Sequence, residues 1–226
     1  MNTVQYSPDR HADLFGEPTD PSVLLWHGAQ SDARASVRTL AELLATRGIG
    51  VVAPDWDSHA PDRGASDLLA SAAFAREWSA GPLVVVGWSM GGAAAAGLTL
   101  RASRHGVAVA HTVCLAGAFM VPDPISGADL TAMVSDERPG TPFTLLHGSA
   151  DDVVPPEAGR RFAAALDDAG WPVQALELPA DHGSIAGARY DAATDSYAAA
   201  TDPHTLEVAG RVAGHIADAV GATHRR

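Results

Sequence analysis

The sequence predicts an α/β fold in which a mostly parallel sheet carries helices on both faces. Short runs of consecutive apolar residues recur along the chain, and such runs are typical of strands buried on both faces. Between them lie longer stretches whose apolar residues recur at helical spacing. Strands and helices that alternate in this way form parallel sheets. Because no repeat, linker or break in composition interrupts the alternation, we expect one domain over residues 1–226.

The expected elements follow one another in a regular order. We expect a hairpin of residues 3–6 and 12–15 at the sheet edge, and then a first buried strand at residues 23–26. The next helix is expected to begin at Ser31 or Asp32, which can cap it, and to end at Gly48. The other expected strands are 49–53, 83–86, 107–115, 143–146 and 173–178, and the other expected helices are 68–78, 90–103, 156–169 and 203–220.

Two segments depart from this alternation. Residues 117–141 contain three prolines and three glycines, and only 128–134 resembles a helix. Residues 187–202 carry Tyr190 and Tyr197 on either side of a polar turn, which indicates a loop or a small hairpin. The first segment is too short to form a large lid, and whether residues 187–202 cover the pocket or a partner subunit stays open.

Composition and charge argue against several classes of function. The net charge of −12 disfavours binding to nucleic acid or to anionic membranes, because both are polyanions. Cys114 is the only cysteine, so neither an intramolecular disulfide nor a cysteine-rich metal site is possible, and we expect it to be a small buried side chain. No apolar window reaches the ~18 residues of a membrane span, and residues 1–15 lack the apolar segment of a signal peptide. We therefore expect a soluble, cytoplasmic protein.

The most informative segment is an apolar strand followed by Gly-Trp-Ser-Met-Gly at residues 87–91 and an alanine-rich helix. A G-x-S-x-G motif between a strand and a helix presents its serine, here Ser89, as a nucleophile on a sharp turn. Glycines at 87 and 91 leave room where the strand and the helix crowd together. The alternative is a tight turn whose serine only caps the helix. The strand–motif–helix context favours catalysis.

With this segment the chain resembles the α/β-hydrolase superfamily, over nearly its whole length. The resemblance implies that an acid and a base follow the serine in chain order, each after a later strand. Residues 147–155 are similar to the H-G-x-x-D-x-x-V-P turn of many esterases in the superfamily, which makes Asp151 the acid. Its neighbour Asp152 is expected to be a solvated or capping carboxylate. Asp151 would hold the imidazole of the base in the correct tautomer and stabilise the imidazolium.

The base has to be chosen among ten histidines. His182 follows the last strand by a short loop, where the superfamily places its base, and His204 near the start of the last helix is its rival. His27 and His147 each precede a glycine at a strand end, and we expect them to brace the active-site loops through hydrogen bonds. The other histidines have no motif support: His11, His59, His105, His111, His215 and His224.

The resemblance also implies two oxyanion donors and a pocket. The main-chain N–H of Met90, the residue after the nucleophile, is one donor. In relatives with an H-G-x motif, the residue after the glycine supplies the second donor. That residue is Ala29 in this chain, with Gln30 as the alternative. Only about 26 residues separate Leu115 from the next strand, so we expect an open, shallow site for small or short-chain acyl groups. The expected pocket walls are aromatic or sulfur-containing side chains: Trp56, Trp88, Phe119 and Met120.

The predicted function is a carboxylic-ester hydrolase that acts through an acyl-enzyme on a small-molecule ester. The start of the chain is similar to carboxylesterase and arylformamidase-like members, although it reads H-G-A-Q at 27–30 where many of them read H-G-G. Dienelactone hydrolases are similar in size but generally carry cysteine at the nucleophile. The alternatives are an amide, formamide or peptide hydrolase on the same residues, and a non-catalytic binding module. No metal-binding or phosphate-binding motif is present, so no metal ion or cofactor is expected. The oligomeric state stays open.

Overall fold

Eight strands form one sheet in the order β1-β2-β4-β3-β5-β6-β7-β8 in the computed structural model, which describes residues 1–223. The β1–β2 and β2–β4 pairs are antiparallel, and every other neighbouring pair is parallel. The edge hairpin and the mostly parallel sheet expected from the sequence are both confirmed. The strands are β1 (Asn2–Ser7), β2 (Arg10–Phe15), β3 (Ser22–Trp26), β4 (Val51–Pro54), β5 (Leu83–Trp88), β6 (Val109–Leu115), β7 (Phe143–Gly148) and β8 (Val173–Leu178).

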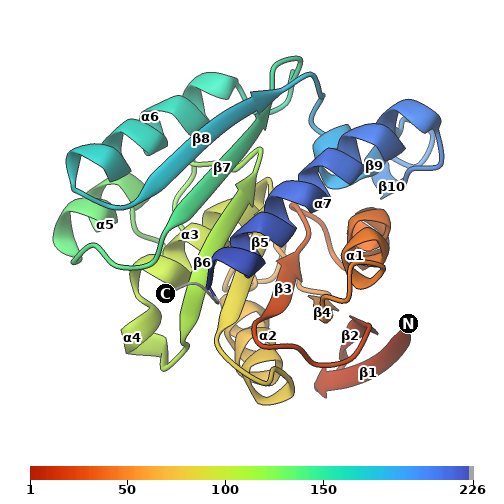
Figure 1. Ribbon diagram of the computed structural model, residues 1–226, viewed down its shortest axis with the longest axis horizontal. Coiled ribbons are helices and arrows are strands. Elements are labelled where there is room, and N and C mark those ends of the chain that lie inside the picture. Colours follow the sequence, from red (N-terminus) through yellow and green to blue (C-terminus); the bar gives the residue numbers. More distant parts are fainter. Residues whose placement is uncertain (224–226) are drawn as a thin grey trace.

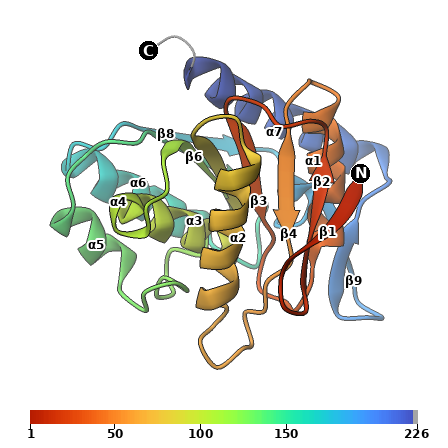
Figure 2. The same cartoon turned by 90° about the horizontal axis from the view of Figure 1, so that it is seen from below.

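Helices cover both faces of the sheet (Figure 1). Two helices, α1 (Arg38–Ala45) and α7 (Pro203–Thr223), pack together on one face. The other face carries α2 (Ala65–Trp78), α3 (Met90–Leu100), α5 (Leu130–Asp136) and α6 (Pro156–Asp168). In Figure 2, α7 and α2 accordingly lie on opposite sides of the strands. A short helix, α4 (Ala102–His105), follows α3.

The two cores explain why the central strands are apolar at every position. Along β3, Val23 and Leu25 face the α1 and α7 layer, whereas Leu24 and Trp26 face the α2 and α3 layer. Side chains alternate between the faces of a strand, so a strand covered on both sides needs apolar residues throughout. Cys114 is buried in the core on the α2 and α3 side, as expected. Burial raises the pKa of its thiol.

The first helix begins later than the sequence predicts. Asp32 has a left-handed backbone (φ 47°), and the Ser31 hydroxyl donates to Asp57 at 2.8 Å, so neither side chain caps the helix. A 3₁₀ turn over Arg34–Val37 comes first, and α1 starts at Arg38. The predicted end is correct, since Gly48 takes the positive φ of 76° that closes a helix.

One further difference concerns a short element, and the segment 187–202 confirms one of the two structures expected for it. The helix expected over 90–103 is divided, because α3 ends at Leu100 and Arg101 leaves the helical conformation before α4 begins. Residues 187–202 form a small antiparallel hairpin of β9 (Ala188–Asp191) and β10 (Ser196–Ala199) beside the start of α7 (Figure 1). None of the helices within residues 1–223 has the length and apolar character needed to span a membrane.

Candidate active site

Ser89 lies on a sharp turn between β5 and α3, with φ 57° and ψ −119°. The turn requires glycine on both sides. A Cβ atom at position 87 would lie 2.0 Å from the main-chain oxygen of Gly91, and one at position 91 would lie 2.3 Å from that of His27. The main chain of Ser89 donates to the Leu115 carbonyl at 2.9 Å, which fixes the turn to β6. Its side chain is therefore held at the carboxyl end of the sheet and stays partly exposed.

His182 links the serine to the acid. Its Nε2 atom lies 3.1 Å from the Ser89 hydroxyl, and its Nδ1 atom lies 2.8 Å from Oδ2 of Asp151. These three side chains come from the loops after β5, β7 and β8, which all end at the same edge of the parallel sheet. The rival His204 is exposed on α7 and has no contact with Ser89 or Asp151 among the described hydrogen bonds. His224 lies outside the described residues.

The turn after β7 holds the Asp151 carboxylate in place. Oδ1 accepts from the main-chain N–H groups of Val153 (2.9 Å) and Val154 (2.8 Å), and Oδ2 faces His182. Burial by itself would raise the pKa of Asp151, but hydrogen bonds from His147, His182 and Val154 outweigh it and hold that pKa well below its usual range. The carboxylate is therefore ionised and can orient an imidazole.

His147 braces the same turn. Its Nε2–H donates to the Val154 carbonyl at 2.9 Å and lies 3.4 Å from Oδ2 of Asp151. Burial lowers the pKa of His147, but the contacts with Asp151 and the Val154 carbonyl more than offset it, so the net pKa is raised. The expected bracing role is confirmed, and the contact with Asp151 itself was not anticipated. Asp152 is exposed, in line with the solvated carboxylate that was expected.

His27 braces the loop on the other side of the serine. Its Nε2 accepts from the main-chain N–H groups of Ala33 and Trp56, each at 3.3 Å, and its Nδ1–H donates to the Gly28 carbonyl at 2.7 Å. Since two N–H donors already point at Nε2, the ring has to be neutral. Burial accordingly lowers the pKa of His27 to about 4.

This loop lies directly against the nucleophile. A Cβ atom at Gly28 would be 3.2 Å from the Cβ of Ser89, so the main chain at Gly28 passes close to the serine. Met90 is the first residue of α3, so its N–H has no intrahelical partner and is free to donate. The arrangement is compatible with an oxyanion site. The assignment of Met90 and Ala29 as donors stays a prediction.

Of the four residues expected to form pocket walls, three are buried and Met120 is exposed, so its assignment stays a prediction. Trp88 is only 2% exposed, because the side chain before the turn points into the core on the α7 side, and its Nε1–H donates to the His182 carbonyl at 2.8 Å. Trp56 is fully buried and stacks on His27. Phe119 stacks on Phe162 at 4.1 Å in the other core, whereas Met120 is 47% exposed. Trp56 and Trp88 therefore support the site rather than form open walls, whereas Phe119 lines a cavity of about 200 Å³ on the α6 side.

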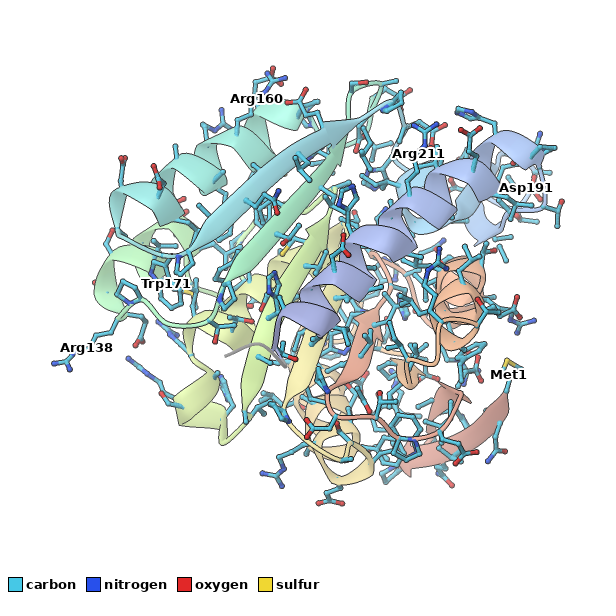
Figure 3. All side chains as sticks on the ribbon, in the orientation of Figure 1. Met1, Arg138, Arg160, Trp171, Asp191 and Arg211 are labelled. Carbon is cyan, nitrogen blue, oxygen red and sulfur yellow. The ribbon has the colours of Figure 1, made fainter. Side chains whose placement is uncertain are left out.

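The β9–β10 hairpin packs against the site, a contact that was not predicted from the sequence. The Tyr197 ring meets the Trp88 ring edge-on at 4.9 Å and lies 6.0 Å from the His182 ring, and Tyr190 packs against Tyr197 at 5.2 Å. Figure 3 shows Asp191 at the outer end of this hairpin, far from the α6 side where Arg160 is labelled. The only sequence signal was the pair of tyrosines around a polar turn. It does not reveal which element they contact.

Solved structures with the same fold include esterases. Native esterase 2 of Thermogutta terrifontis aligns with a TM-score of 0.69 and 18% identity, covering 96% of this chain and 90% of that one. An esterase of Pyrobaculum calidifontis aligns with a TM-score of 0.64 and 18% identity, covering 94% of this chain and 81% of that one. Est1E of Butyrivibrio proteoclasticus aligns with a TM-score of 0.65 and 16% identity, covering 94% of this chain and 95% of that one. A search of curated protein sequences found no match. The sequence model of the alpha/beta hydrolase family matches residues 23–224, and the chain belongs to that family.

Proposed function

We propose that this protein is a serine-dependent carboxylic-ester hydrolase that acts through an acyl-enzyme on small or short-chain esters. One observation carries the proposal. The buried imidazole of His182 lies within hydrogen-bonding distance of both the Ser89 hydroxyl (3.1 Å) and the ionised Asp151 carboxylate (2.8 Å). A nucleophile, a base and a group that orients the base, in this mutual geometry, form the constellation for acyl transfer.

The reaction proceeds in two steps. His182 Nε2 takes the proton of Ser89 as its oxygen attacks the ester carbonyl, and the same nitrogen then protonates the departing alcohol. Water activated by His182 releases the acid in the second step. The N–H groups of Met90 and Ala29 stabilise the oxyanion, and the loss of one such donor typically costs about 2.7–4 kcal/mol of transition-state stabilisation. Side chains and main chain supply each proton transfer and each contact, so the mechanism invokes no metal ion or cofactor.

Two observations support a small acyl group. The segment between β6 and β7 contains only one short helix, α5, so no large lid encloses the serine. Esterase 2 of Thermogutta terrifontis, which shares the fold, has been crystallised with propionate bound and with butyrate bound. By analogy we propose acids of about this size for the present chain.

Initial rates on p-nitrophenyl esters from acetate to decanoate test the proposal. The wild type is expected to be fastest on the short esters, and Ser89→Ala and His182→Ala should both fall to background. His204→Ala is the matched control: this histidine is exposed on α7, and its variant should keep wild-type rates. Equal rates for wild type and Ser89→Ala would refute the proposal. Turnover of matched amides alone would favour an amide hydrolase.

A covalent probe gives a second readout. Thermogutta terrifontis esterase 2 is phosphorylated by paraoxon. Paraoxon should likewise add a diethylphosphoryl group to this protein, with mass spectrometry placing it on the peptide that contains Ser89. The Ser89→Ala protein should stay unlabelled. Labelling at another residue would contradict the assignment of the nucleophile.

A further inference from the structure

A cavity of about 580 Å³ lies between three segments: the loop after β7 that carries Asp151, the loop after β8 that carries His182, and the β9–β10 hairpin. Of the three proposed triad residues, only His182 lines it. The rest of the lining combines apolar and aromatic residues, Ala150, Val153, Ala188, Tyr190 and Tyr197, with four polar or charged ones, Asp152, Asp181, Arg189 and Thr205.

The position of the cavity identifies the part of an ester that it can hold, if the proposed function is correct. In the first step a bond forms between the Ser89 oxygen and the carbonyl carbon, while the bond from that carbon to the alcohol oxygen breaks. The proton from Ser89 reaches the alcohol oxygen by way of His182 Nε2. The acyl group must therefore contact Ser89, whereas the alcohol must contact His182. A cavity that is lined by His182 and not by Ser89 suits the alcohol.

The walls indicate the chemistry of that alcohol. Tyr190 is 48% exposed although it is a large aromatic side chain, and its ring is tilted against that of Tyr197. Its hydroxyl donates to Asp195, which turns the polar end of the side chain away toward the hairpin turn. Val153, on the opposite loop, is 56% exposed. Two aromatic rings and an apolar side chain around one space favour a flat, aromatic group over a saturated one.

Tyr197 also ties this wall to the catalytic residues. Its ring packs edge-on against Trp88, and Trp88 holds the main chain of His182 through the 2.8 Å hydrogen bond. An occupant that packs against the two tyrosines is therefore positioned relative to the imidazole that protonates it. We infer that the cavity is the leaving-group subsite of the enzyme and that it takes an aromatic alcohol, packed against Tyr190 and Tyr197. This inference rests on the proposed ester hydrolysis.

Benzyl acetate and cyclohexylmethyl acetate form a matched pair of substrates, because they differ mainly in whether the six-membered ring is aromatic. We expect the ratio of their kcat/KM values to fall about three- to ten-fold in Tyr190→Leu relative to wild type, the range for one aromatic pair contact. Tyr190→Phe keeps the ring and should keep the wild-type ratio. Each kcat/KM is divided by that for methyl acetate, which has no ring to bind, so that a general effect of the substitution on catalysis cancels. Asp168→Asn, exposed on α6 and outside the cavity, is the control that should keep the wild-type rates on all three substrates.

A binding measurement separates failure of the inference from failure of the proposed function. Benzyl alcohol should shift the NMR signals of the β9–β10 hairpin in the Ser89→Ala protein, and Tyr190→Leu should weaken these shifts. If wild type hydrolyses esters through Ser89 but the substrate ratio does not change in Tyr190→Leu, the subsite is refuted and the esterase stands. If no ester is hydrolysed, the leaving-group assignment falls together with the proposed function, whether or not benzyl alcohol binds.

Discussion

Acidification should weaken the fold through His27. The ring is fully buried, and its Nε2 accepts two main-chain N–H groups, from Ala33 and Trp56. A proton on Nε2 would break both hydrogen bonds and place a charge in the core. The folded protein therefore binds this proton only near pH 4, whereas the unfolded chain binds it near pH 6.5.

The sign and size follow from linkage. Because the pKa in the folded state is lowered, the stabilisation is fully present above about pH 6.5 and is lost as the pH falls toward 4. Between pH 7.5 and 4.5, a shift from 6.5 to about 4 corresponds to a loss of roughly 2.5 kcal/mol in the free energy of unfolding. The lowered pKa of Asp151 acts mainly at more acidic pH, as the pH falls through and below the usual carboxyl pKa, and the raised pKa of His147 stabilises the fold on acidification. Both contributions are common to wild type and to a variant at position 27, so their comparison isolates His27.

The assay is urea unfolding followed by tryptophan fluorescence at both pH values, on wild type, His27→Gln and His59→Gln. The glutamine oxygen at position 27 can accept the same two N–H groups but does not titrate, so this variant should lose about 2.5 kcal/mol less on acidification. His59 is exposed in the loop after β4, and its variant should behave like wild type. An equal loss in wild type and His27→Gln would refute the reasoning, as would a pKa near 6.5 for His27 measured by NMR.

The remaining predictions concern the site and its supports. Asp151→Asn presents an amide N–H to His182, which favours the wrong imidazole tautomer, so kcat should fall about 10⁴-fold. The control Asp168→Asn, at an exposed position on α6, should keep the wild-type rate. Gly91→Ala forces a methyl group to within 2.3 Å of a main-chain oxygen, and urea unfolding should show a loss of about 3 kcal/mol. Trp88→Phe removes the hydrogen bond to the His182 carbonyl. It should lower the thermal midpoint, and kcat should fall with KM little changed; a fall confined to KM would contradict a positioning role.

The sequence alone determined the alternation of strands and helices and the position of the turn at Ser89. Both are local properties. An apolar strand covered on two faces shows as a continuous apolar run, and the close contact between β5 and α3 demands glycine at 87 and 91, within the motif itself. The order of Ser89, Asp151 and His182 came from the resemblance to the superfamily, and the parallel strands explain why it works: the loops after their carboxyl ends meet at one edge of the sheet.

Only the tertiary structure decided the contacts that join segments distant in sequence. Trp88 was expected to form an open wall, but the packing of α7 over its face of the sheet buries it beneath His182. The contact of His147 with Asp151, and of Tyr197 with Trp88, depends on where the loop after β7 and the β9–β10 hairpin fold back. Periodicity tells which side of its own strand or helix a residue occupies. It carries no information about which distant side chain covers that side, and the walls of the candidate site are made of such contacts.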